Sequence, residues 1–151
     1  MNQSLKWTVK KFEELTLVEL YDLLALRAEV FVVEQNCVYQ DVDGKDDKAL
    51  HVLAKENDTL LAYTRIFKPG DYFKEASIGR VVVSPHLRGR KLGYDLMKKS
   101  IEAVETHFKT TSIHISAQCY LIDFYKNLGF KPQGESYLED DIPHIAMFFE
   151  K

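Results

Sequence analysis

The spacing of hydrophobic residues changes several times along the chain. Alternating apolar and polar residues predict a half-buried strand at residues 5–11. Apolar residues then recur at helical spacing, from a capping box at Thr16 and Glu19 to about Val33. The first 33 residues are therefore predicted to form a strand and an amphipathic helix.

The rest of the pattern predicts shorter elements. Predicted strands are His51–Lys55, Leu60–Phe67, Ala76–Val83, Ser112–Ala117 and Ile145–Phe149. Predicted helices are Leu92–Phe108 and Tyr120–Leu128. A long acidic loop at Glu34–Lys48 is expected between the first helix and the strand at His51, and a turn-rich segment at Lys131–Asp141 before the last strand. This order predicts an α/β (α+β) fold in which helices pack on a mixed sheet, with residues 1–151 forming one domain.

Three cations, Arg88, Arg90 and Lys91, stand at the predicted start of the second long helix. A helix N-terminus already carries partial positive charge, so each uncompensated cation costs roughly 0.3–1 kcal/mol. Free N–H groups at such an end bind phosphates, and Gly89 and Gly93 would let a ligand approach the backbone closely. We expect an anion-binding loop, with a solvated basic turn as the alternative.

The composition of the chain limits the class of ligand that the basic loop can bind. The net charge of −3 argues against a non-specific nucleic-acid binder, so a small anionic ligand suits the basic loop better. We expect no membrane partner, because no apolar run approaches ~20 residues. The N-terminus lacks the apolar core of a signal peptide, and Cys37 and Cys119 lie far apart without metal-ligand spacing. These features predict a cytoplasmic protein without a metal site.

Two segments together resemble a known superfamily. The strand, basic loop and helix start at Val81–Gly93, followed by Phe124–Phe130, resemble the GNAT acyl-CoA-dependent N-acetyltransferases. Arg27–Gln35 and Asp141–Ile145 are similar to the ElaA-like branch, and the resemblance covers essentially the whole chain. It implies a GNAT fold: a central, mostly antiparallel mixed sheet flanked by helices, with splayed strands forming a slot for CoA. It also implies acetyl-CoA as the cofactor.

The resemblance implies a set of cofactor-binding residues. Backbone groups of the strand would pair with pantetheine, the loop N–H groups would hold the pyrophosphate, and Gln118 would contact the cofactor arm. The implied residues are Val81, Val82, Val83, Arg88, Gly89, Arg90, Lys91, Leu92, Gly93, Gln118 and Tyr125. Lys91 stands where the family pattern has a glycine, and we expect it to keep helical backbone angles.

Tyr125 resembles the general acid of the family. A phenol with an ordinary pKa near 10 keeps its proton at neutral pH and can give it to a leaving thiolate. The alternative is a tyrosine that only packs on its helix. Candidates for the general base are Glu34, which we select provisionally, the loop residues Asp41 and Asp43, and His144.

Arg27, Arg65 and Arg80 fall inside apolar patterns. A guanidinium is rarely buried without a partner, so these residues either pair with loop aspartates such as Asp43 and Asp46 or read an acceptor substrate. The predicted acceptor-binding residues are Arg27, Phe31, Arg65, Arg80 and His144.

The leading hypothesis is an acetyl-CoA-dependent N-acetyltransferase that acts on a small-molecule or peptide amine, as a monomer or homodimer. One alternative is a non-catalytic module that binds or senses acyl-CoA. Another is an acyl-homoserine-lactone synthase, whose N-terminal helix also carries an arginine and phenylalanine pair, here Arg27 and Phe31. The CoA loop argues against that enzyme, and so does Cys37, which stands roughly where that family keeps a tryptophan.

Overall fold

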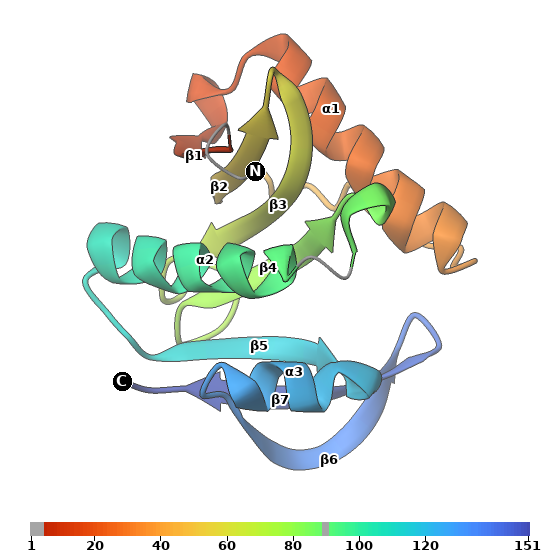
Figure 1. Cartoon of the computed structure of the whole chain (residues 1–151). Coiled ribbons are helices and arrows are strands. Elements are labelled where there is room, and N and C mark those ends of the chain that lie inside the picture. Colours follow the sequence, from red (N-terminus) through yellow and green to blue (C-terminus); the bar gives the residue numbers. More distant parts are fainter. Residues whose placement is uncertain (1–4, 89–90) are drawn as a thin grey trace.

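The computed structural model describes residues 5–88 and 91–151. Their strands form two antiparallel sheets (Figure 1). The first sheet has the order β1-β2-β3-β4, with β1 (Lys6–Lys11), β2 (Leu50–Glu56), β3 (Thr59–Phe67) and β4 (Ser77–Val83). The second has the order β5-β7-β6, with β5 (Ile113–Gln118), β6 (Lys131–Glu139) and β7 (Ile142–Phe149). The predicted α/β fold, mostly antiparallel and flanked by helices, is confirmed.

The helices connect these strands. The principal helices are α1 (Leu17–Arg27), its π-helical continuation η2 (Ala28–Glu34), α2 (Leu92–Phe108) and α3 (Ile122–Asn127). Short 3₁₀ turns are η1 (Phe12–Glu14), η3 (Pro85–Leu87) and η4 (Cys119–Leu121). In the part of the chain that the structure describes, no helix is long and apolar enough to cross a membrane.

The predicted capping box starts α1 and also links the helix to the first sheet. The Glu19 N–H donates to Thr16 Oγ1 at 3.0 Å, and the Thr16 N–H donates to Glu19 Oε1 at 2.9 Å. Lys10 of β1 and Lys55 of β2 each lie 2.9 Å from the same carboxylate. Burial alone would raise the pKa of Glu19, but these bonds more than offset it and hold the pKa at about 2.

The two long helices cover opposite faces of the first sheet. Leu53 and Tyr63 pack with α1, whereas the neighbouring residues Val52, Ala54 and Ala62 pack in the cluster that contains α2. Successive side chains of a strand point to opposite faces, so this alternation explains the near-continuous apolar sequence of the central strands. Figure 1 shows α2 crossing one face of the sheet, while α1 runs along the other side of β3, to its right in this view.

The two sheets meet at one end only. Ala76, just before β4, and Ile113 form an isolated parallel bridge, and the His114 N–H donates to the Ala76 carbonyl at 2.8 Å. The strand pairing of the described residues contains no further ladder between β4 and β5. The two strands start side by side in the same direction and then separate, which is the predicted splayed pair.

The prediction for Lys131–Asp141 was wrong, because most of this segment is strand β6. Every residue of β6 is exposed, so the strand has no apolar alternation to reveal it, and Pro132 is tolerated at a sheet edge. A two-residue turn with φ of 51° at Asp140 and 64° at Asp141 connects β6 to β7. Strand β7 therefore begins at Ile142 and is longer than predicted.

Candidate active site

A cleft of about 840 Å³ opens where β4 and β5 separate. Strand β4 is the edge of the first sheet and β5 is the edge of the second, so two strand edges without ladder partners face the space between them. The other walls come from η2, the start of α2, α3 and the β6–β7 turn. An unpaired strand edge offers backbone donors and acceptors to an extended ligand.

Most of the predicted site residues line this cleft. Those that do are Phe31, Glu34, Arg80, Val81, Val82, Val83, Arg88, Lys91, Leu92, Gly93, Gln118, Tyr125 and His144. Gly89 and Arg90, also predicted for the cofactor, lie outside the described residues. Arg27 and Arg65 do not belong to the described lining and lie in a separate polar network.

The start of α2 faces the cleft and has no side-chain cap. Lys91 occupies the N-cap position with φ of 61° and ψ of 15°, so the expected right-handed helical conformation was wrong. A non-glycine residue in this left-handed region costs roughly 1–2 kcal/mol. A Cβ on Gly93 would meet only the Phe124 ring, at an ordinary contact of 3.5 Å, so packing within the protein does not require a glycine there.

Tyr125 projects from α3 into the cleft wall and is 5% exposed. Its ring packs edge-on against Phe124 and Phe130, with centroid distances of 5.0 and 5.8 Å. Burial raises the pKa of the Tyr125 phenol above its ordinary value, with a smaller contribution from Tyr120. The side chain is therefore protonated at neutral pH and held in one place.

Glu34 and Arg88 form an exposed ion pair between the end of η2 and the segment before α2. Arg88 Nη2 donates to Glu34 Oε1 at 2.7 Å, and Nη1 bonds to the other carboxylate oxygen. This bidentate contact lowers the pKa of Glu34 and raises that of Arg88. A carboxylate held this way is a poorer proton acceptor than a free one.

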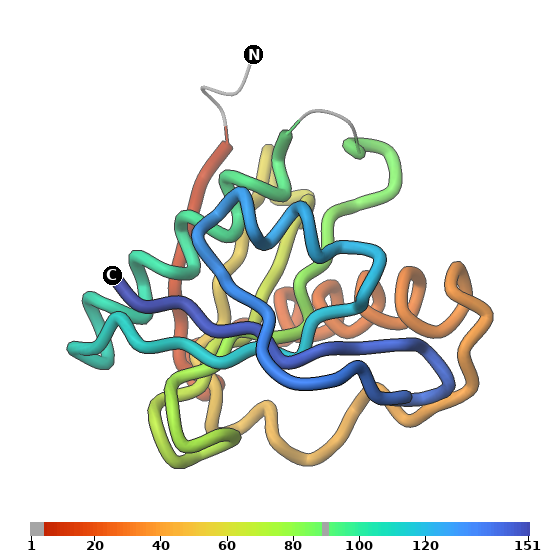
Figure 2. The backbone as a smooth tube through the Cα atoms, turned by 90° about the horizontal axis from the view of Figure 1, so that it is seen from below, coloured from red at the N-terminus to blue at the C-terminus, as the bar shows by residue number. Residues whose placement is uncertain are grey.

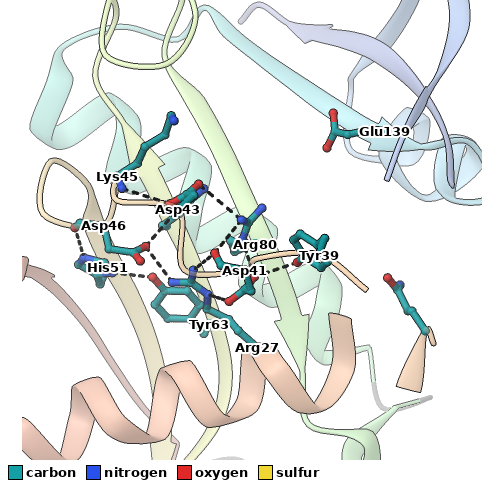
Figure 3. Close-up of polar contacts among 12 residues, drawn as sticks. Arg27, Tyr39, Asp41, Asp43, Lys45, Asp46, His51, Tyr63, Arg80 and Glu139 are labelled. Carbon is teal, nitrogen blue, oxygen red and sulfur yellow. Dashed lines mark hydrogen bonds and ion pairs between the residues drawn. The ribbon is translucent and has the colours of Figure 1, made fainter. Parts of the chain in front are cut away.

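The three inward arginines pair with the acidic loop (Figure 3). Arg27 donates to Asp41 at 2.7 Å and to Asp46 at 2.8 Å. Asp46 Oδ1 also accepts from Arg65 at 2.9 Å, so one carboxylate oxygen joins α1 to β3. These contacts are the structural salt bridges that the sequence left open as one of two readings.

The same loop is tied to β4. Arg65 Nη2 lies 2.6 Å from Asp43, and Arg80 Nη2 donates to the Asp41 carbonyl at 2.9 Å. Arg80 Nε lies 2.8 Å from Asp41 Oδ1, an ion pair without hydrogen-bond alignment. Burial alone would raise the pKa values of Asp43 and Asp46, but the guanidinium bonds and charges lower both. Of the three arginines, only Arg80 lines the cleft as well.

The end of η2 and the loop after it touch the second sheet. Gln35 and Gln118 lie 3.4 Å apart through their amide groups, and Cys37 Sγ donates to the Asp140 carbonyl at 3.3 Å. Figure 2 shows the β6–β7 hairpin in blue beside the orange segment that follows α1. These contacts join the two sides of the cleft at the end away from the Ala76 bridge.

The sequence did not reveal one part of the cleft. Tyr39, Ser116, Glu139 and Asp140 also line it, and Figure 3 shows Glu139 on the second sheet, across from Tyr39. Glu139 was missed because its strand was read as a series of turns. The two-residue turn after it was the available signal, since such turns join paired strands. Within the described residues, no group of three or more His, Cys, Asp or Glu could hold a metal ion.

Comparison with known proteins identifies the class. A family model described as an acetyltransferase (GNAT) domain matches residues 16–151. The solved structure of an acyl-CoA N-acyltransferase from Pseudomonas aeruginosa superposes with a TM-score of 0.89 at 46% identity, covering 95% of this chain and 99% of that one. The chain therefore belongs to the GNAT acetyltransferase family.

Within this family the chain is similar to ElaA proteins, as predicted. It is 46% identical over 145 residues to the Escherichia coli K12 protein ElaA, and the match covers 95% of both chains. The crystal structure of Escherichia coli ElaA gives a TM-score of 0.90 at 45% identity, over 97% of this chain and 99% of that one. The acyl-homoserine-lactone synthase LasI is only 13% identical, at a TM-score of 0.76, and shows a shared fold alone.

Asp46→Ala should lower the free energy of unfolding by about 3–5 kcal/mol, because two buried guanidiniums lose their shared acceptor. Asp47→Ala, at the exposed neighbouring position, should change it by less than about 0.5 kcal/mol. Chemical denaturation of both variants measures the difference. Equal stability of the two variants would show that the network contributes little to folding.

Proposed function

We propose that this protein is an acetyl-CoA-dependent N-acetyltransferase that transfers the acetyl group directly to an amine of a small molecule or peptide. The observation that carries the proposal is the cleft between β4 and β5, which combines two strand edges, an uncapped helix N-terminus and a buried tyrosine. The family assignment supports an acyltransferase reaction in general. The donor and the acceptor are our inference.

The described residues fit a CoA thioester. The Val81–Val83 edge can exchange hydrogen bonds with the pantetheine amides, as an added strand would. The N–H groups of Leu92 and Gly93 begin a 17-residue helix and have no side-chain cap, which suits a pyrophosphate. Lys91 adds a positive charge at the same end. When bound, acetyl-CoA would supply an activated acyl group.

Tyr125 fits the role of proton donor to the departing sulfur. The apolar surroundings raise the free energy of the Tyr125 phenolate, and they raise the free energy of a thiolate as well. Burial therefore does not by itself prevent proton transfer from the phenol to the sulfur. Glu34 was our provisional base, but its pairing with Arg88 and lowered pKa weigh against that role.

Thiol release and thermal shift together test the proposed function. Acetyl-CoA at 100 times its Kd should stabilise the protein by about 2.7 kcal/mol. In a panel of polyamines, amino acids and peptides, at least one amine should cause release of free thiol from acetyl-CoA. The absence of any shift would contradict CoA binding altogether. A shift without thiol release across the panel would favour the non-catalytic acyl-CoA module.

Two lysines in left-handed conformation flank α2 and form a matched pair, with φ of 61° at Lys91 and 59° at Lys109. Glycine at either position relieves the same backbone strain, so both variants should be stabilised by up to about 1 kcal/mol. Only Lys91→Gly should weaken CoA binding, by about three- to ten-fold at low ionic strength, because it removes a charge beside the proposed phosphate site.

Calorimetric titration of CoA at two salt concentrations measures this effect. Lys91→Gly should also flatten the salt dependence of binding, whereas Lys109→Gly should match the unmodified protein. If the two variants bind CoA equally well, the segment before α2 is only a basic turn.

Tyr125→Phe should lower kcat by about 10²–10⁴-fold, the usual contribution of a general acid, and leave CoA affinity nearly unchanged. The substitution removes only the hydroxyl, so ring packing against Phe124 and Phe130 is retained. Steady-state kinetics with the best amine of the panel and CoA titration give both quantities. Unchanged turnover would remove Tyr125 from the chemistry.

A further inference from the structure

His144 lines the cleft with one ring nitrogen that has no hydrogen-bond partner among the described residues. The residue lies on β7, lines the cleft and is 6% exposed. Its Nδ1 lies 2.7 Å from the Ile142 carbonyl oxygen. A carbonyl can only accept a hydrogen bond, so Nδ1 carries the proton of the neutral ring and Nε2 keeps its lone pair.

Strands β6 and β7 hold this ring in place, and β5 holds the β6 side chains beside it. Tyr137 of β6 stacks on it, with ring centroids 6.3 Å apart and planes inclined by 21°. Ser116 of β5 lies 2.6 Å from the Tyr137 hydroxyl and donates to Glu139 Oε1 at 3.0 Å. Burial raises the pKa of Tyr137, so that hydroxyl stays protonated and does not compete as a base.

Glu139 stands beside the free nitrogen without bonding to it. Its Oε2 lies 3.7 Å from His144 Nε2, which is outside hydrogen-bond range but close enough to pair with a protonated ring. The Glu139 side chain is 46% exposed, so it reaches the cleft surface where a cationic amine would arrive. The pair thus combines a buried proton acceptor, His144, with a carboxylate at the cleft surface, Glu139.

The other predicted bases are already engaged. Glu34 is held by Arg88, and Asp41 and Asp43 are held by the buried arginines. Guanidinium contacts lower the pKa values of Glu34 and Asp43 and make both weaker proton acceptors. Among the candidates drawn from the sequence, His144 is the one whose acceptor atom pairs with no cation in residues 5–88 and 91–151.

We propose that His144 is the catalytic base for the acceptor amine and that Glu139 stabilises the imidazolium; this rests on the proposed function. His144 Nε2 removes one proton from the substrate ammonium. The nitrogen lone pair then bonds to the thioester carbonyl carbon while the carbon–sulfur bond breaks, and Tyr125 gives its proton to the sulfur. The new amide nitrogen passes its extra proton through water to the Tyr125 phenolate, and His144 returns its own proton to solvent.

Several charged or titratable groups face His144 or line the same cleft, and each can contribute to a measured pH profile. Glu139 and Tyr137 face the ring from β6, and Asp140 lies in the adjoining turn. Tyr39 and Arg80 line the same cleft from the loop and β4, where Asp41 and Asp43 already pair with the Arg80 guanidinium.

His144→Gln should lower kcat at neutral pH by about 10²–10⁴-fold while CoA affinity and the melting temperature stay close to those of the unmodified protein. The pH profile of kcat, measured with two panel amines of different basicity, should lose the acidic limb that both amines share. His107→Gln, on the exposed side of α2, serves as the control and should keep both rate and limb.

Glu139→Gln gives an independent readout if His144→Gln folds poorly. Loss of the carboxylate destabilises the protonated ring, so the shared acidic limb should move to lower pH. A His144→Gln variant that keeps its turnover and limb, or a Glu139→Gln limb that does not move, would overturn this assignment and leave the acetyltransferase intact. An unmodified protein that releases no thiol with any panel amine would overturn both.

Discussion

The divergence of β4 from β5 is the constraint on which the rest of the molecule depends. One parallel bridge at Ala76 and Ile113 joins the two sheets, and beyond it the described strands share no ladder. Backbone groups at a strand edge need partners, and a bound chain-like ligand can supply them. The cleft is therefore a consequence of strand topology, which side chains then adapt to a reaction.

The buried arginine and aspartate network keeps that opening in shape. The acidic loop follows η2 and would have little apolar surface to anchor it, yet Asp41 and Asp46 bind Arg27 of α1 inside the protein. Asp43 and Asp46 bind Arg65 of β3 in the same way. Removing one partner of a buried ion pair costs more free energy than forming the pair gains, because an uncompensated charge stays buried. The network therefore holds the loop in one position. That position places Tyr39 at the cleft.

Most of the helices and strands could be predicted from the sequence. The capping box at Thr16, the long amphipathic helix α2 and the β-branched strand β4 all follow local rules that the structure confirms. Strand β6 was missed, because an exposed edge strand that contains Pro132 has no apolar alternation. Lys91 was misjudged for another reason: its left-handed backbone runs against the preference of a lysine, so no rule based on residue type indicated it.

The residues that line the cleft also divide into those found from the sequence and those missed. Those on β4 and at the start of α2 lie together in sequence and were found. Glu139 was missed because its strand pairing was indicated locally only by the two-residue turn at Asp140 and Asp141. A crystal structure with bound CoA tests the central claim most directly. The account predicts pantetheine between β4 and β5, with its amides paired to Val81–Val83 and the pyrophosphate at the N–H groups of Leu92 and Gly93. CoA bound elsewhere, with this cleft left to solvent, would contradict it.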